Sequence, residues 1–233
     1  MPAGVEPAVT PAATTPVASS VTPGYWDEAC KHLVKRDRVM RKLIPTFGEV
    51  RLQIRGDAFT TLARSIVGQQ ISVKAAQAVW LRFAALLAGD DALVAPAAVL
   101  TLGLPALRAV GLSARKSDYL CDLAKHFANG EVHVAQWQQM EDEAIIEELV
   151  AIRGIGRWTA EMFLIFHLMR PNVLPLDDVG LIKGISVNYF SGEPVSRAEA
   201  REVGDAWAPF RSVATWYIWR SLDPSASVTP KAS

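Results

Sequence analysis

Apolar residues recur every three to four positions along most of the chain between residues 25 and 222, and strict alternation of apolar and polar residues is scarce. A period of three to four places apolar side chains on one face of an α-helix. The intervals between these segments are short and contain Gly and Pro, which end helices. Val50–Ile54 is the single candidate for a β-strand. The sequence therefore predicts an all-α fold.

The periodic segments fall into two groups. We expect the N-terminal helices, within about residues 25–55, to pack with the C-terminal ones, within about 171–222, while residues 56–170 form a central lobe. A cleft between two lobes is a common place for a substrate site. The individual helices are predicted at Tyr25–Met40, Phe59–Leu87 (interrupted at Gly68-Gln69-Gln70), Pro96–Leu102, Pro105–Val110, Ser113–Phe127, Glu141–Ala151, Gly156–Leu168 and Ala198–Trp219.

Both ends of the chain differ in composition from the part between them. Residues 1–24 are rich in Pro, Ala, Thr, Ser and Val and contain no Lys or Arg. Such a segment buries too little apolar surface to offset its loss of conformational entropy, so we expect a disordered N-terminal tail. Without basic residues it is also a poor secretory signal. Residues 223–233 are predicted to form a similar loose tail.

The overall composition excludes several classes of protein. No apolar run approaches the roughly 20 residues of a membrane span, so no membrane association is expected. The formal net charge is zero, which argues against indiscriminate electrostatic binding of nucleic acid but leaves room for a local basic face. The two cysteines, Cys30 and Cys121, are far apart and are expected to be free thiols. The four histidines show no metal-ligand spacing.

A glycine turn separates two of the predicted helices. An apolar helix ends near Ile152, Gly154-Ile155-Gly156 forms the turn, and the next helix begins at once. Glycine allows a positive φ and the close approach of another backbone. The amides of Gly154, Gly156 and Arg157 at a helix start would then suit a phosphate group. An isolated Gly-x-Gly also fits an ordinary turn between antiparallel helices, so the spacing alone leaves both interpretations open.

The wider sequence resembles the helix-hairpin-helix (HhH-GPD) superfamily of DNA glycosylases, whose hairpin is followed some twenty residues later by Pro and an essential Asp. The wording GIGRWTA at 154–160 and LPLDDVGLIKG at 174–184 is most similar to the 3-methyladenine DNA glycosylase II branch. The resemblance extends to GQQIS at 68–72, GLSARK at 111–116, WAPFRS at 207–212 and Trp219. It implies a two-lobed helical fold with the hairpin at about 143–168. From its length, we expect a compact version without the N-terminal β-domain of some relatives.

Two adjacent carboxylates follow the hairpin, and the family uses one of them. The family's acid precedes a short apolar stretch that opens a helix, which favours Asp178 as the catalytic residue. The spacing from Pro175 favours Asp177 instead, for which the alternative is a helix N-cap. Without the resemblance, a capping role is also the expected role of Asp178. Cleavage of an N-glycosidic bond builds positive charge on the sugar. A fixed carboxylate beside that sugar stabilises the charge and can orient or deprotonate the attacking water.

The residue two positions beyond Gly156 bears on the reaction type. Relatives that also cut the DNA strand have a lysine there, which attacks the sugar as an amine. This chain has Trp158, so the resemblance implies a monofunctional hydrolase in which water attacks. The four-cysteine iron–sulfur cluster of the endonuclease III branch cannot be built from two cysteines.

Trp158, Met162 and Trp219 are the predicted base pocket. Trp158 and Met162 are one helical turn apart, and Trp219 matches a pocket aromatic of the family. Indole rings attract the positive charge of alkylated purines such as 3-methyladenine and 7-methylguanine. Without the resemblance, core packing would be the expected role of both tryptophans. The family's best-known members have an aromatic residue at the Met162 position, which bears on base preference.

Two further segments are predicted to contact DNA. Gln69, Gln70 and Ile71 match the segment that fills the gap left by a flipped base. Relatives place an apolar residue at the Gln70 position, so the identity of the wedge stays open. Arg115 and Lys116, near a helix start, are candidates for phosphate contacts, as is Arg157, and a solvated helix face is the alternative.

The resemblance also implies partners and ions. The hairpin carbonyls of Val150, Ile152 and Gly154 are candidate ligands for a Na⁺ or K⁺ ion, and no other cofactor is expected. The predicted partner is double-stranded DNA with damaged bases, bound by a monomer, at the cytoplasmic nucleoid if the host is bacterial. Two alternatives remain: the same fold acting on deaminated, etheno or oxidised bases, and a non-catalytic DNA-binding module.

Overall fold

The computed structural model describes residues 22–48, 50–53, 56–87 and 94–223, and within these ranges the chain contains eleven α-helices and no β-strand. The all-α prediction is confirmed. The predicted tails lie outside the described residues, except for residues 22–24 and 223. The helices are α1 Trp26–Arg36, α2 Met40–Thr46, α3 Ala58–Gly68, α4 Val73–Leu87, α5 Pro96–Ala109, α6 Ala114–Ala128, α7 Asp142–Val150, α8 Arg157–Phe166, α9 Val179–Tyr189, α10 Arg197–Asp205 and α11 Arg211–Ser221.

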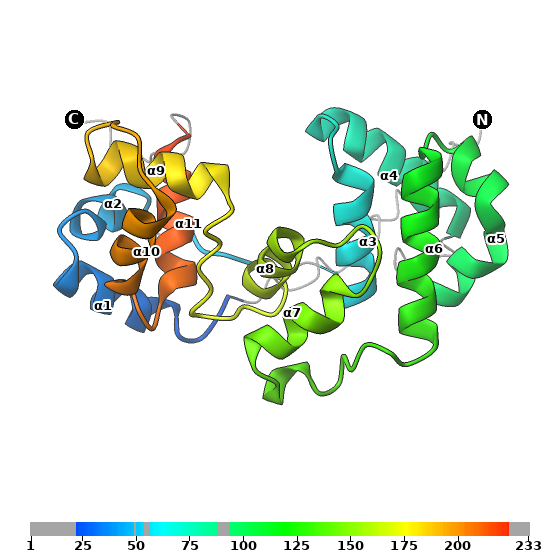
Figure 1. The fold of residues 1–233 in the computed structure, drawn as a ribbon, viewed down its shortest axis with the longest axis horizontal. Helices are drawn as coiled ribbons and strands as arrows, with labels where there is room; N and C mark the ends of the chain where they lie inside the picture. Colours follow the sequence, from blue (N-terminus) through cyan, green and yellow to red (C-terminus); the bar gives the residue numbers. More distant parts are fainter. Residues whose placement is uncertain (1–21, 49, 54–55, 88–93, 224–233) are drawn as a thin grey trace, which may run out of the picture.

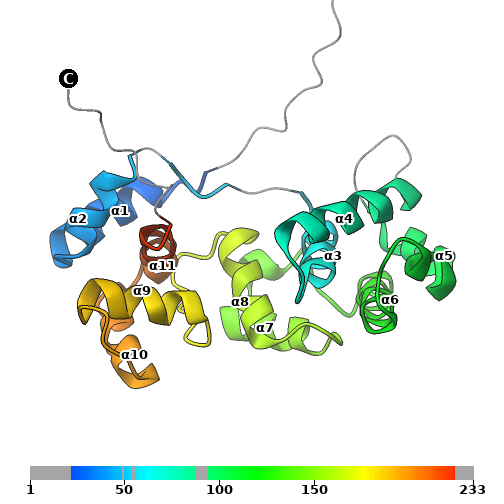
Figure 2. The same ribbon diagram turned by 90° about the horizontal axis from the view of Figure 1, so that it is seen from above.

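The helices form two groups with α7 and α8 between them (Figure 1). On one side α11 packs against α1, α2 and α9, and α9 packs against α10. On the other side α3 packs against α4 and α6, and α5 packs against α6. The turned view in Figure 2 shows the same separation. Helix α8 packs against α7 and α3, and its Trp158 donates a hydrogen bond to Asp178 at the start of α9, so it is in contact with both groups.

Each group is held together by aromatic packing between residues distant in sequence. In the first, the ring of Trp26 lies 5.2 Å from that of Trp216 in an edge-on contact. In the second, Phe59 of α3 packs edge-on against Phe127 of α6 at 5.2 Å, and Trp137, which follows α6, packs edge-on against Phe163 of α8 at 5.4 Å. Trp26 and Trp137 are each 1% exposed. Large aromatic side chains contribute much of the apolar area buried in a core, so these rings anchor the helices that carry the site.

Some predicted helix boundaries were wrong. The segment Tyr25–Met40 is broken at Asp37, whose Oδ1 accepts hydrogen bonds from the amides of Val39 and Met40 at 2.7 and 2.9 Å and so begins α2. The predicted helix Ala198–Trp219 is two helices, because the segment between α10 and α11 contains Pro209, which has no N–H to donate. The break predicted between the helices at 96–102 and 105–110 is confirmed, because α5 contains a non-helical backbone at Gly103, with φ +69°, that separates two helical stretches.

The strand predicted at Val50–Ile54 is also a correction. Residues 50–53 form no strand and link the two groups of helices, and Ile54 lies outside the described residues. A strand needs a neighbour to accept its backbone hydrogen bonds, and residues 50–53 have no strand beside them in the described part of the chain.

Protonation of His167 should destabilise the fold. Its Nδ1 lies 3.3 Å from Thr61 Oγ1, and its ring stacks on Phe163 at 4.6 Å. Burial lowers the pKa of His167 below the ordinary 6.5, against a smaller opposing effect of Asp57. Below that pH the unfolded chain binds a proton that folded His167 does not, so the free energy of unfolding falls with pH. We expect the melting temperature of wild type to drop more between about pH 7.5 and pH 5.5 than that of His167→Gln. Parallel pH profiles would contradict this expectation.

Candidate active site and DNA-binding face

The hairpin between α7 and α8 is fixed against α6. Gly154 has a φ of +88°, and a Cβ built on it would lie 2.2 Å from Cδ2 of Tyr119. Arg153 donates hydrogen bonds from its backbone N and its Nε to the carboxylate of Asp122 at 2.9 and 3.0 Å. Gly156 begins α8 and supplies no side-chain cap. The first amides of α8 are therefore left for a ligand at the positive end of the helix.

Asp178 lies at the start of α9 and is surrounded by N–H donors. Its Oδ1 accepts from the Leu181 amide at 2.6 Å and from Trp219 Nε1 at 2.7 Å. Its Oδ2 accepts from Trp158 Nε1 at 2.8 Å. A carboxylate offers about four acceptor positions, so three are occupied and one remains for a water molecule. The carboxylate is thus held in one orientation by donors from α8, α9 and α11.

The helix N-cap is Asp178 rather than Asp177. The Leu181 amide bonds to Asp178, whereas Asp177 is exposed and forms an ion pair with Arg197 of α10. The capping role considered for Asp177 is therefore wrong. Capping by Asp178 fixes its side chain relative to α9. It also directs the two carboxylate oxygens of Asp178 toward the indole N–H groups of Trp158 and Trp219. The carboxylate of Asp177 pairs with Arg197 instead.

The three predicted pocket residues converge on this carboxylate or lie one turn from it. Trp158 is 44% exposed and Trp219 is half-buried, and both donate to Asp178. Met162 follows Trp158 on α8 and lines a cavity of about 540 Å³ bounded by α3 and α8. Phe166, which the sequence analysis missed, stacks on Trp219 with ring centroids 5.6 Å apart. Its spacing of four from Met162 puts it on the same helical face, and this was the available signal.

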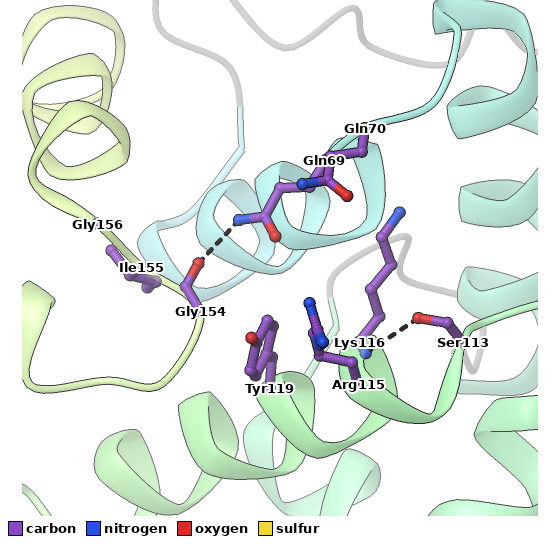
Figure 3. Close-up of a pocket in the computed structure, with 9 residues that line it drawn as sticks. All are labelled: Gln69, Gln70, Ser113, Arg115, Lys116, Tyr119, Gly154, Ile155 and Gly156. Carbon is purple, nitrogen blue, oxygen red and sulfur yellow. Dashed lines mark hydrogen bonds between the residues drawn. The ribbon is translucent and has the colours of Figure 1, made fainter. Parts of the chain in front are cut away.

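A second hollow contains most of the residues predicted to bind DNA. It has a volume of about 530 Å³ and opens between the hairpin, the α3–α4 turn and the start of α6 (Figure 3). Ser113 is the N-cap of α6, and its side-chain oxygen accepts a hydrogen bond from the Lys116 amide. Two helix N-termini, those of α6 and α8, therefore border one hollow and favour negative charge there. Its lining residues are Gln69, Gln70, Ser113, Arg115, Lys116, Tyr119, Gly154, Ile155 and Gly156.

Ile71 lies beside this hollow rather than in it. It is 40% exposed and lines an adjoining depression together with Val67, Val79 and Leu112. An apolar side chain with apolar neighbours on its own protein gains part of its burial without DNA. Gln70, which is also exposed on the turn, lines both this depression and the hollow at the hairpin.

The predicted basic contacts differ in what they already bind. Arg115 is exposed at the edge of the hollow. Lys116 donates from Nζ to the carbonyl of Val67 at 2.8 Å, and burial lowers the pKa of its ammonium. Arg157 forms hydrogen bonds to both Glu143 and Glu161, and its bond to Glu143 raises its pKa. Arg157 lines a different hollow, on the side of α10, so the structure does not group it with the other DNA-binding candidates.

The carbonyls predicted to hold a monovalent cation lie at the hairpin. The carbonyl of Gly154 accepts a hydrogen bond from Gln69 Nε2 at 2.8 Å, and that of Ile152 accepts from the Ile155 amide at 3.1 Å. A carbonyl oxygen has two lone pairs, so both can take a second partner.

In the described ranges, no helix is long and apolar enough to cross a membrane.

Comparison with known proteins places this geometry in a family. The family model for HhH-GPD superfamily base excision DNA repair proteins matches residues 63–209. The chain is 31% identical to DNA-3-methyladenine glycosylase 1 of Schizosaccharomyces pombe over 209 residues, which is 88% of each chain.

Solved structures give the same result. A DNA-3-methyladenine glycosidase from Bacillus halodurans superimposes with a TM-score of 0.80 at 35% identity, covering 90% of this chain and 94% of that one. The S. pombe 3-methyladenine DNA glycosylase in complex with abasic DNA has a TM-score of 0.75 at 29% identity, covering 87% of this chain and all of that one. The chain belongs to the HhH-GPD superfamily of base excision DNA repair proteins.

Proposed function

We propose that this protein is a monofunctional DNA glycosylase that removes alkylated purines, such as 3-methyladenine and 7-methylguanine, from duplex DNA. The observation that carries the proposal is the Asp178 carboxylate, held by the indole N–H groups of Trp158 and Trp219, with Met162 one helical turn from Trp158 lining a cavity between α3 and α8. The similar S. pombe and B. halodurans proteins are named for 3-methyladenine, which supports this substrate class.

The reaction replaces one bond to the sugar by another. The C1′–N bond breaks and its electron pair leaves with the base, while positive charge develops on the sugar. Asp178 stabilises that charge and takes a proton from the attacking water, whose oxygen bonds to C1′. The products are a free base and an abasic site. An alkylated purine that carries positive charge leaves as a neutral base, which makes it a better leaving group than an undamaged purine.

The side chains around Asp178 favour hydrolysis over strand cleavage. A lyase needs an amine nucleophile at the sugar, and the hairpin position that carries it in other glycosylases is Trp158 here. Lys116 of α6 instead donates to the backbone carbonyl of Val67 in α3. Water is therefore the proposed nucleophile.

Base selection rests on the aromatic and apolar surface of α8 and α11. The exposed face of Trp158 and the stacked pair of Phe166 and Trp219 offer π-surfaces to a flipped base. Such surfaces favour a cationic purine over a neutral one. Met162 adds a polarizable, adaptable side chain at the same face. This surface supports alkylated purines ahead of oxidised bases, which carry no positive charge.

DNA is proposed to lie across the hollow that borders the hairpin, with phosphates at the Gly154–Gly156 amides and Arg115 nearby. Gln70 is the proposed wedge, because it is exposed on the α3–α4 turn and lines the hollow at the hairpin, whereas Ile71 lines only the adjoining depression. A Na⁺ or K⁺ ion on the hairpin carbonyls would strengthen phosphate binding electrostatically. We further propose that the protein acts as a monomer on damaged duplexes, at the nucleoid in a bacterial host.

Release of methylated bases tests the function directly. Purified protein is incubated with methylated duplex DNA, the released bases are chromatographed, and a parallel sample receives borohydride to trap any Schiff base. We expect free 3-methyladenine or 7-methylguanine and no trapped protein–DNA adduct. A trapped adduct would contradict hydrolysis by water. If alkylated, deaminated, etheno and oxidised substrates all gave no release while duplex binding persisted, the protein would be a binding module instead.

A further inference from the structure

The side chain of Gln69 joins two segments that are 85 residues apart in sequence. Gln69 follows α3 directly, and its Nε2 donates a 2.8 Å hydrogen bond to the carbonyl of Gly154 in the hairpin. Figure 3 shows the side chain reaching from the α3–α4 turn to that carbonyl. The bond is partly buried, where hydrogen bonds are electrostatically stronger than in water. It connects the proposed phosphate-binding loop with the turn that carries Gln70.

Both ends of this bond are held by other contacts. At the hairpin, Gly154 packs against the ring of Tyr119, and neighbouring Arg153 is bound to Asp122. At the turn, Lys116 Nζ donates to the carbonyl of Val67, near the end of α3. The segments that Gln69 connects are therefore themselves restrained by α6. Because the Gln69 side chain connects two restrained segments, it can fix the position of the α3–α4 turn relative to the hairpin.

The residue after Gln69 has an unusual backbone. Gln70 has a φ of +56°, a region that side chains other than Gly, Asn and Asp seldom adopt. A conformation of this kind costs roughly 1–3 kcal/mol and persists only where its surroundings impose it. The hydrogen bond of the adjacent Gln69 is one contact that can impose it. The exposed Gln70 side chain thus takes its direction from a neighbour anchored to the hairpin.

We propose that Gln69 is a positioning residue that sets the α3–α4 turn against the hairpin, so that backbone binding at the hairpin places Gln70 at the gap left by a flipped base. This inference rests on the proposed function and assigns Gln69 no contact with the base. It predicts that Gln69 matters for DNA in which a base is missing or flipped. For an undamaged duplex, whose stack has no gap, the bond should make little difference.

A double-mutant cycle tests the coupling. The variants are Gln69→Leu, which keeps the approximate size but removes the donor, Gln70→Ala, and the double variant. Gln77→Leu is the matched control, because Gln77 is an exposed residue of α4 whose side-chain oxygen accepts a hydrogen bond from Arg64 of α3. Affinities are measured for an undamaged duplex and for one with a non-hydrolysable abasic analogue. A fluorescent base opposite the analogue reports insertion of the wedge.

We expect Gln69→Leu to lose about 5-fold in affinity for the abasic analogue, the equivalent of one neutral hydrogen bond, and to change binding of the undamaged duplex less than about 2-fold. The fluorescence signal of insertion should fall with it. Because Gln69 acts through Gln70, the double variant should bind no more weakly than Gln70→Ala. The Gln77→Leu control should match wild type on both duplexes.

Three results would overturn the proposal. Additive losses in the double variant would show that Gln69 acts independently of Gln70. Equal losses on both duplexes would show a general structural role. Unchanged binding of the analogue would show no role in insertion. If thermal melting shows Gln69→Leu to be unfolded, Gln69→Glu, which places an acceptor against the Gly154 carbonyl, enters the same cycle. None of these measurements needs turnover, so failure of the proposed hydrolysis is recognised separately by base release from the wild type.

Discussion

Replacing Asp178 by Asn should lower the single-turnover rate of methylated-base release by roughly 10³-fold, the scale on which an active-site electrostatic group stabilises a transition state. Asn has the same shape and is a good N-cap, so it can still accept from the Leu181 amide and α9 should form normally. It lacks the negative charge that offsets the charge on the sugar and cannot take a proton from water. The rate is measured with enzyme in excess over a duplex with one 7-methylguanine.

Asp177→Asn is the matched control for this variant. Asp177 is exposed and its ion pair with Arg197 lies at the surface, where such pairs contribute little to stability. We expect its rate to stay within about 3-fold of wild type, consistent with a surface pair worth under 1 kcal/mol. The reverse pattern, with a slow Asp177 variant and a normal Asp178 variant, would move the catalytic role to Asp177. Binding of abasic duplex by Asp178→Asn shows that the loss is one of chemistry.

Gly154→Ala should have the largest effect on folding and on duplex binding among single changes in the hairpin. The residue has a φ of +88°, and its new Cβ would lie 2.2–2.8 Å from ring atoms of Tyr119. Strain in this backbone region costs roughly 1–3 kcal/mol, and overpacking costs a similar amount. We expect a loss of about 2–4 kcal/mol in the free energy of unfolding, measured by denaturant titration. Affinity for an undamaged duplex should fall at least about 10-fold as the loop is displaced from its phosphate-binding geometry.

Gly156→Ala separates these two effects. Its φ is −94°, and a Cβ there meets no atom within 4 Å. We expect the free energy of unfolding to change by less than about 1 kcal/mol, as for Gly→Ala at a compatible position. If its duplex affinity nevertheless falls, the phosphate backbone approaches this residue directly. A Gly154 variant as stable as the Gly156 variant would show that Tyr119 moves aside and that the hairpin is less constrained than described.

Most of the helices could be predicted from the local sequence, because the spacing of apolar residues indicates which face of a helix is buried. Helix α9 was not found this way, since Gly180 and Gly184 interrupt its pattern and lower its helix propensity. Both glycines are there for packing. A Cβ on Gly184 would lie 2.3 Å from Cγ2 of Ile218, and one on Gly180 would lie 3.0 Å from Oδ1 of Asp178 and 3.3 Å from Cδ1 of Trp219. Such close approach depends on α11, more than thirty residues later, and cannot be read from neighbours in the chain.

The hydrogen-bond partners of the basic residues also could not be predicted from neighbouring residues in the sequence. Lys116 pairs with a carbonyl of α3 and Arg157 with Glu143 of the preceding helix. In sequence both resemble free cations beside a glycine turn. By contrast, placing Asp178 near Trp158 and Trp219 depended on the family resemblance, since twenty and forty-one residues separate the carboxylate from its two indole donors. Family motifs supplied the long-range information that spacing lacks.

The contact between Trp26 of α1 and Trp216 of α11 has a consequence for biosynthesis. Because these rings are separated by 190 positions in the chain and pack 5.2 Å apart, this core cannot close until the residues of α11 have left the ribosome. The residues of α3–α8 emerge earlier and can already pair locally, as segments synthesised first generally do. Trp219, one of the two indoles that hold Asp178, is made only with α11. A nascent or prematurely terminated chain could therefore display its hairpin to DNA without an assembled carboxylate site, and would leave the genome's glycosidic bonds intact.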